Sequence, residues 1–343
     1  MWVTALLASA TSCSGADDEG DSSISSVTLS VDKTSITANG SDVATFTVKN
    51  GGNVVTSQVE LRCLTTNKPV SDNKFSTTEA GTYEFQATVN GMASNKVTVV
   101  ANAVVESKYL RQICVMDFTG AWCMNCPPFY RILNLLTTSD TYKDHCHLIA
   151  VHDNSEGEPN DPMEIQAGKD LISQFKITQF PQAVIDMRDV TANNQKEVTD
   201  ALSRSLAEYP AHCGVAVKSV VSNGVANVTV KVTSETQDDY RLVLYVVEDN
   251  IKSPQLEATG LVNDNYNHRH VLRALASGSI IGDKLGTLTA GQEVSKEYTV
   301  TLDEAWKLKD LSFYALALDK NGYVNNMAVC AADGGDTDYI LAK

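Results

Sequence analysis

The sequence predicts a multidomain α+β protein, and three observations lead to this fold class. The chain has 343 residues, which is enough for two or three domains. Apolar and polar residues alternate with the period of β-strands toward both ends of the chain. Between these regions, strand-like apolar runs alternate with segments of helical periodicity. We therefore expect a β-domain, an α/β domain and a second β-domain, in that order.

The composition narrows the classes of function. The chain is 43% hydrophobic and 20% charged, which is typical of ordinary packed cores. Its net charge is -15, and it has no basic stripe that could neutralise phosphates. No apolar run reaches the roughly 18 residues that a membrane-spanning helix needs. These features argue against a nucleic-acid partner and against a helical membrane span.

The N-terminus has the residue pattern of a targeting signal. Residues 2–10 are mostly apolar, small residues precede Cys13, and residues 14–19 are small or acidic. This order resembles a bacterial lipoprotein signal followed by the acidic export tag of surface lipoproteins of Bacteroidetes. It departs from the signal at Ala10, where leucine is usual, and in lacking Lys or Arg before the apolar run. We expect residues 1–23 to be a signal and tether with lipid on Cys13; a disordered N-terminus is the alternative.

Residues 24–104 have the pattern of a small β-sandwich. Short alternating runs are separated by turn residues such as Asn50-Gly51-Gly52. The segment 79–85 resembles the tyrosine corner of immunoglobulin-like domains, with Phe85 where antibody domains carry cysteine. The resemblance implies an immunoglobulin-like β-sandwich. A spacer is its expected role, and ligand binding is the alternative.

Residues 105–210 alternate between strands and helices. The predicted strands are residues 113–118, 147–151 and 183–185, and the predicted helices are an amphipathic segment around 129–136 and residues 163–175 and 194–209. This order implies an α/β domain. From residue 211 to 343 the strand pattern returns, at residues 225–232, 240–247, 294–302, 311–318 and 323–330. We expect a C-terminal β-sandwich there.

Cys123 and Cys126 are the most informative residues of the chain. They lie three positions apart, between an apolar strand and an amphipathic helix, which is the sequence form of a thioredoxin-like redox site. We expect Cys123 to be the exposed attacking sulfur and Cys126 the buried resolving one. The pair Pro127-Pro128 predicts a helix that starts near Pro128, which would weaken the activation of Cys123 by the helix N-terminus.

The resemblance to thioredoxins extends beyond the two cysteines. Trp122 matches the tryptophan before the first cysteine of the family, and Asp117 matches a buried aspartate that takes the proton of the second thiol. A solvated position at the strand end is the alternative for Asp117. Phe180-Pro181 precedes a strand, as the cis-proline of the family does; an ordinary trans proline is the alternative. The resemblance implies catalytic roles for Cys123, Cys126, Asp117 and Pro181, and substrate contacts for Trp122 and Phe180.

The remaining cysteines do not indicate a disulfide-stapled scaffold. Cys213 and Cys330 could form a second disulfide, whose pairing the sequence leaves open. Cys63, Cys114 and Cys146 lie in or beside apolar runs, so we expect buried thiols there.

Histidines and aspartates give weaker signals. His145, His147 and His152 lie around one strand, and His268 and His270 would share a face if they lay on a strand. No carboxylate or cysteine spacing supports a metal site at the first group, and metal is only the minority alternative at the second. Asp333, Asp336 and Asp338 match no calcium-loop pattern well. We therefore expect no metal and no cofactor.

The order of the segments resembles the outer membrane protein 28-related lipoproteins of Bacteroidetes. Four segments carry the resemblance: residues 122–127, 161–163, 180–181 and 268–273. It covers about residues 105–343 and implies an outer membrane location and a thioredoxin-like domain. The resemblance does not settle the activity. The joint presence of Cys123, Cys126, Asp117 and Pro181 favours a lipid-anchored thiol–disulfide oxidoreductase that acts on thiols or disulfides of exported proteins. The β-domains on both sides of the cysteine pair favour the alternative, a surface binding or adhesion protein whose disulfide is structural.

Overall fold

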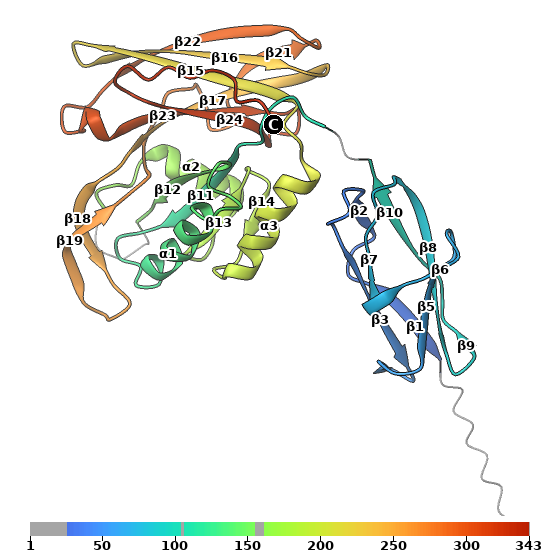
Figure 1. Cartoon of the computed structure of the whole chain (residues 1–343). Coiled ribbons are helices and arrows are strands. Elements are labelled where there is room, and N and C mark those ends of the chain that lie inside the picture. The colour runs from blue at the N-terminus through green and yellow to red at the C-terminus, as the bar shows by residue number, and fades with distance from the viewer. Residues whose placement is uncertain (1–25, 104–105, 155–160, 343) are drawn as a thin grey trace, which may run out of the picture. The chain divides into compact units, whose positions relative to one another are not determined.

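A computed structural model describes residues 26–103, 106–154 and 161–342 (Figure 1). The predicted signal, the tether and the lipid site at Cys13 lie outside these residues. The chain divides into two compact units, up to residue 104 and from residue 105 onward. Strands dominate both units, which confirms the predicted β-rich multidomain organisation. Within the described ranges, the helices are too short or too polar to cross a bilayer.

The first unit packs two β-sheets against each other over residues 26–103. One sheet contains β1 (Val27–Val31), β3 (Ala44–Asn50), β4 (Asn53–Val54) and β7 (Lys74–Phe75). The other contains β2 (Ser35–Thr37), β5 (Val59–Cys63), β6 (Lys68–Pro69), β8 (Gly81–Val89), β9 (Met92–Ala93) and β10 (Val97–Asn102). Alternate residues of these strands fill the core, and Phe46 and Phe85 pack with ring centroids 4.6 Å apart. The Tyr83 hydroxyl donates to the carbonyl oxygen of Glu79 at 2.8 Å.

The second unit is built on a large sheet of nine strands, counted over the described residues. Its order is β14-β13-β11-β12-β20-β17-β23-β24, and β21 pairs with β17. The strands are β11 (Ile113–Thr119), β12 (Cys146–His152), β13 (Gln182–Ile185), β14 (Asp189–Thr191), β17 (Asp238–Glu248), β20 (Val271–Leu275), β21 (Asp283–Leu288), β23 (Leu311–Leu318) and β24 (Val324–Ala331). The strand β11 runs parallel to β12 and antiparallel to β13.

Helices cover both faces of the first half of this sheet. The helices are α1 (Cys126–Thr137), α2 (Gln166–Phe175) and α3 (Gln195–Glu208). Apolar residues of α1 and α3, such as Leu133 and Leu202, share a core with Val115. Leu171 of α2 packs with Met116, in a separate core. Because side chains of a strand alternate between faces, α2 lies on the face opposite to α1 and α3.

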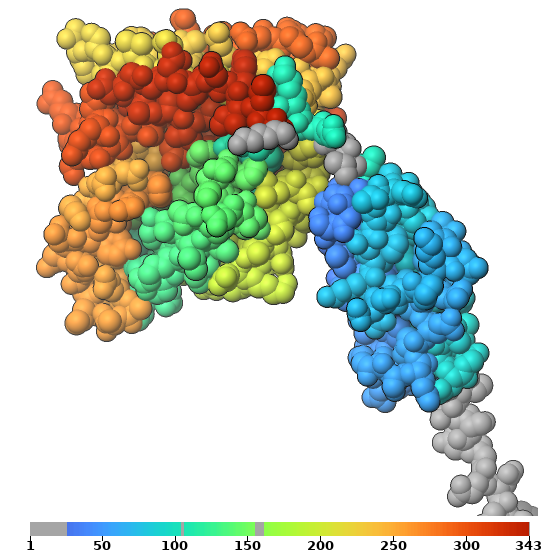
Figure 2. All heavy atoms as spheres, viewed as in Figure 1, coloured from blue at the N-terminus to red at the C-terminus, as the bar shows by residue number. Residues whose placement is uncertain are grey.

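A second layer covers the other half of the sheet. It consists of β15 (Cys213–Ser222), β16 (Val225–Ser234) and β22 (Glu293–Thr301). Val230 of this layer shares a core with Leu244 and Phe313 of the large sheet. A hairpin of β18 (Ile251–Leu256) and β19 (Val262–His268) extends between β17 and β20. In the space-filling view the orange atoms of this hairpin adjoin the green atoms of the strand–helix segment (Figure 2).

The structure does not separate residues 105–210 from residues 211–343 as the sequence predicts. Both segments belong to one compact unit, because β12 pairs in parallel with β20 at Ala150 and Val271. A buried hydrogen bond also crosses the expected boundary: Arg111, which forms an ion pair with Asp186 at 2.6 Å, donates to the carbonyl oxygen of Val324 at 3.0 Å. The expected boundary is therefore a point where the chain changes from helices to strands within one body.

The cysteines outside the Cys-x-x-Cys motif are free thiols in the described residues. Cys213 and Cys330, which the sequence offers as a second disulfide, lie unbonded in the core of the C-terminal sandwich. Cys63 and Cys114 are buried as expected, whereas Cys146 is half-buried.

Candidate redox site

Cys123 and Cys126 form a disulfide in the turn between β11 and α1. Their Cα atoms are 5.4 Å apart. The helix begins at Cys126, two residues earlier than the sequence predicts, with Pro127 and Pro128 in its first turn. Proline is tolerated there because the first N–H groups of a helix have no partner within it. Cys123 precedes the helix by three residues, so the helix N-terminus supports mainly Cys126.

Cys123 is less accessible than the sequence predicts. It is only 5% exposed, and Cys126 is 1% exposed. The strand β18 lies against the turn, and its Leu256 N–H donates to the carbonyl oxygen of Ala121 at 2.8 Å. Nothing in the local sequence around the cysteines indicates this cover. Met124 remains 42% exposed at the tip of the turn.

Trp122 connects the cysteine turn to the loop that carries Pro181. The rings of Trp122 and Phe180 meet edge to face with centroids 5.5 Å apart. The Trp122 indole N–H donates to the carbonyl oxygen of Asp153 at 2.8 Å. The peptide bond between Phe180 and Pro181 is cis, as predicted. The structure thus brings together the predicted substrate contacts and the predicted proline loop.

Asp117 is buried in the middle of β11, so the solvated alternative is wrong. It lies in register with Ala150 of β12 and Ala183 of β13 and is 2% exposed. Its Oδ1 atom has no hydrogen-bond partner among the described residues. Burial raises the pKa of this carboxyl group to about 7. The group can therefore accept and release a proton near neutral pH.

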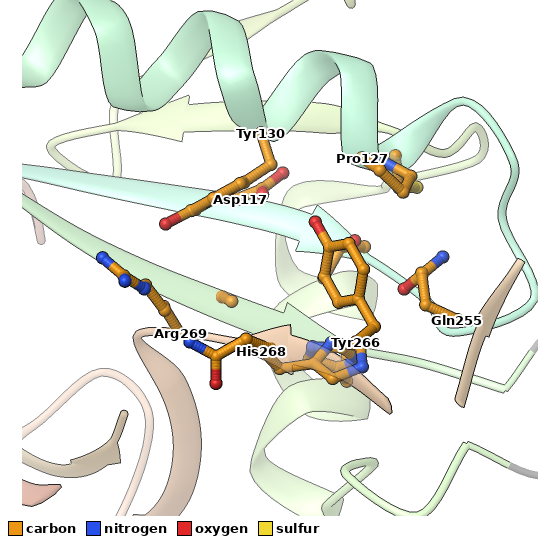
Figure 3. Close-up of a pocket in the computed structure, with 12 residues that line it drawn as sticks. Asp117, Pro127, Tyr130, Gln255, Tyr266, His268 and Arg269 are labelled. Atoms are coloured by element: carbon orange, nitrogen blue, oxygen red, sulfur yellow. The ribbon is translucent and has the colours of Figure 1, made fainter. Parts of the chain in front are cut away.

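A small pocket joins Asp117 to the second cysteine. Its walls include Asp117, Thr119, Cys126, Pro127, Tyr130, Ala150, His152, Gln255, Tyr266, Asn267, His268 and Arg269. Its volume is about 20 Å³, which is enough to hold a water molecule. Figure 3 shows Asp117 and Tyr130 on one side, with Tyr266 and Arg269 directed into the space from the other. The pocket provides a place for a water beside the buried carboxyl group.

The hairpin β18–β19 supplies four of the twelve residues that line the pocket, and the sequence around the cysteines does not predict them. Gln255 comes from β18, Tyr266 and His268 come from β19, and Arg269 follows β19. These residues lie about 130 positions after the cysteines in the chain. The run 268–273 that carries the family resemblance was the available signal, because it begins at the end of this hairpin.

Asp161 holds the turn from the other side. It accepts hydrogen bonds from His152 Nδ1 at 2.7 Å, from the Ala121 N–H at 2.7 Å and from the Met163 N–H at 2.9 Å. Burial by itself would raise the pKa of Asp161, but these hydrogen bonds hold it below its usual value. Asp161 thus fixes the backbone of the turn at Ala121.

His152 and His268 line the pocket, whereas His147 and His270 lie outside its lining. His268 stacks edge to face on His152 with centroids 5.3 Å apart, and burial lowers the pKa of His268 to about 4. His270 has a positive φ of 56° and follows the end of β19, so the two histidines do not share a strand face. His147 binds the Gln112 side chain at 2.8 Å. Among the described residues, no three metal-binding side chains lie together.

Comparison with known proteins relates the chain to outer membrane proteins. A family model described as outer membrane protein Omp28 matches residues 168–333, slightly less than half of the chain. No curated protein matches the sequence.

Solved structures show similar folds. HBP35 of Porphyromonas gingivalis has a TM-score of 0.55 at 18% identity, over 69% of this chain and 81% of that one. A structural genomics target from Agrobacterium tumefaciens has a TM-score of 0.46 at 13% identity, over 69% and 100%. A domain of the outer membrane lipoprotein Omp28 from Porphyromonas gingivalis has a TM-score of 0.26 at 17% identity, over 36% and 89%. At 18% identity, the similarity to HBP35 is a similarity of fold.

The family match begins in α2 and extends over the C-terminal strands, including the hairpin β18–β19. It confirms the predicted outer membrane location. Over residues 168–333 the chain is thus similar to the Omp28 family, and its location is the outer membrane.

Proposed function

We propose that this protein is a thiol–disulfide oxidoreductase that acts on exported proteins at the outer membrane. The observation that carries the proposal is the pocket in which Cys126 and the buried Asp117 lie together. A carboxyl group with a free oxygen atom beside a resolving cysteine is suited to moving a proton. A disulfide with a purely mechanical role has no need of such a group.

The chemistry follows thiol–disulfide exchange. In the reduced protein, the Cys123 thiolate attacks a substrate disulfide and forms a mixed disulfide, which releases one substrate thiolate. The Cys126 thiol then gives its proton to Asp117 through the pocket and attacks the Cys123 sulfur. This step releases the second substrate thiolate and leaves the disulfide of the structure. Two electrons pass from the cysteine pair to the substrate.

We also infer a thioredoxin-like arrangement for residues 105–210, and the order of strands and helix around the cysteines supports it. The cysteine pair follows β11 at the start of α1, and β12 and β13 flank β11 in parallel and antiparallel directions. Trp122 joins the turn to the Pro181 loop through Phe180. We further infer an immunoglobulin-like first unit, which the bond from Tyr83 to Glu79 supports.

Trapping tests the reaction. C126S leaves Cys123 without its resolving partner, so the protein should accumulate mixed disulfides with envelope proteins in cells. The variant C123S/C126S is the matched control and should trap none. If C126S traps no partner, and Cys123 of the reduced protein resists alkylation at neutral pH, oxidoreductase activity is excluded.

Burial of Cys123 favours a second candidate function, a binding or adhesion protein with a structural disulfide. Its 5% exposure leaves little room for a substrate sulfur unless the site opens. A structural disulfide of this kind has a reduction potential below about -300 mV. The potential of the pair therefore distinguishes the two functions.

With either function, we propose that lipid on Cys13 attaches the protein to the membrane. The proposal rests on the order of an apolar segment, small residues and a cysteine in residues 2–13. Metabolic labelling with an alkyne fatty acid should mark the wild-type protein and not C13A. Equal labelling of both proteins would exclude lipidation at Cys13.

A further inference from the structure

The hairpin β18–β19 contacts the backbone of the reactive turn through Gln255. The side chain of Gln255 is 3% exposed, and its amide nitrogen donates to the carbonyl oxygens of Gly120 and Cys123, each at 3.2 Å. It also lies 2.9 Å from the carbonyl oxygen of Leu256. A side-chain amide has two hydrogens, so the three acceptors share them. Both donor hydrogens of Gln255 are thus committed near the turn.

Other contacts fix the same turn at Ala121. Its N–H donates to Asp161 and its carbonyl oxygen accepts from the Leu256 N–H. The turn also closes on itself, because the Cys123 N–H donates to the Gly120 carbonyl oxygen at 3.0 Å. The Gln255 amide is the side-chain donor that reaches both ends of this closed turn. A side chain from a distant strand therefore holds the segment that ends in the first cysteine.

We infer that Gln255 is a positioning residue for the Cys123–Cys126 pair, and that it favours the disulfide over the dithiol. The biological role of this positioning rests on the proposed function. The equilibrium constant for disulfide formation, which tests it, can be measured whether or not the protein is an oxidoreductase. Oxidation removes two hydrogens from the two thiols and forms one sulfur–sulfur bond. With glutathione disulfide as oxidant, two molecules of glutathione are formed and the electrons balance.

The direction of the effect follows from conformational freedom. When the disulfide opens, the turn 120–123 gains freedom unless other bonds hold it. Gln255 holds its two carbonyl groups in the closed arrangement, so the dithiol loses less freedom when the disulfide forms. Without Gln255 the dithiol gains freedom that the disulfide form cannot gain. The equilibrium constant for disulfide formation should then fall.

The experiment is a redox titration of the full chain in glutathione buffers. Q255L should lower the equilibrium constant for disulfide formation about fivefold to tenfold, which corresponds to about 20–30 mV. Q255N keeps an amide on a side chain shorter by one methylene group and should cause a smaller shift in the same direction. N265A, at an exposed position of the same hairpin, is the control and should leave the constant unchanged.

Thermal unfolding separates positioning from general support. If Gln255 only stabilises the fold, its loss lowers the unfolding temperature of the oxidised and reduced forms equally, and the constant stays within twofold of wild type. That result would overturn the inference. If Q255L does not fold, the same test is applied to Q255N. Insulin reduction by the wild-type protein is measured in parallel. A shifted constant in a protein that cannot reduce insulin upholds positioning and refutes the proposed function.

Discussion

At the scale of single residues, Asp117 links stability to pH. Its native pKa is about 7 because it is buried, whereas an aspartate in an unfolded chain titrates near about 3.9. Between these values the native state keeps a proton that the unfolded state has lost. The contribution of Asp117 to the free energy of unfolding therefore falls as the pH rises from about 4 to about 7, and it is constant above that range.

Replacing Asp117 with asparagine should remove this pH dependence. The oxidised wild-type protein should lose on the order of 3 kcal/mol more stability than D117N between pH 5 and pH 8. Urea unfolding of both proteins at the two pH values gives this double difference, in which other titrating groups cancel. Identical pH dependence in the two proteins would show that Asp117 does not titrate in this range.

At the scale of elements, we expect the hairpin β18–β19 to limit access to Cys123, because β18 is hydrogen-bonded to the cysteine turn. It joins β17 to β20, whose ends already pair at Glu248 and Val271. An Asn-Gly turn can therefore replace residues 250–269 without changing the large sheet. We expect this change to speed alkylation of Cys123 about tenfold in the C126S background, because the cover over the turn is gone.

Peptide mapping by mass spectrometry follows Cys123 separately from the other thiols. N265A in the same C126S background is the control, because it leaves the hairpin in place. An unchanged alkylation rate after removal of the hairpin would mean that the hairpin does not limit access to the site.

The helices and most strands of residues 105–210 could be predicted because their periodicity is local. The predicted helix at residues 194–209 is α3 (Gln195–Glu208), with Asn194 capping it by accepting from the Glu197 N–H at 3.0 Å. The hairpin could not be predicted, because β19 is mostly exposed and has no apolar alternation.

Some residues of the candidate site could be predicted from the local sequence, and others could not. Asp117, Trp122 and the two cysteines could be predicted, because they lie within ten residues of one another in the chain. Gln255 could not, since its role depends on hydrogen bonds to carbonyl groups about 130 residues away, and no local pattern encodes them.

At the scale of the whole molecule, the strand–helix segment and the C-terminal sandwich form one body. Tyr245 and Leu316 of the C-terminal strands pack in the same core as Met116 and Leu171. The continuity depends on the pairing of β12 with β20, which residues far apart in the chain create. A change in periodicity near residue 210 therefore does not indicate a domain boundary.

Truncation tests this continuity. Residues 106–210 alone should show no cooperative urea unfolding. Without the C-terminal strands, the core between the sheet and α2 loses about half of its apolar residues. Residues 106–342 should unfold in one cooperative transition, and residues 26–103 should do so independently. Circular dichroism in the far and near ultraviolet follows all three. A cooperative transition for residues 106–210 would restore the boundary that the sequence predicts.

The reduction potential of the Cys123–Cys126 pair in the full-length wild-type protein is the most direct measurement. Equilibration with glutathione or dithiothreitol, followed by alkylation and mass spectrometry, gives its value. An exchanging pair beside a proton acceptor should have a potential above about -300 mV, in the range of thiol–disulfide oxidoreductases. A potential below that value would show that the disulfide is a permanent part of the scaffold, which contradicts a redox function.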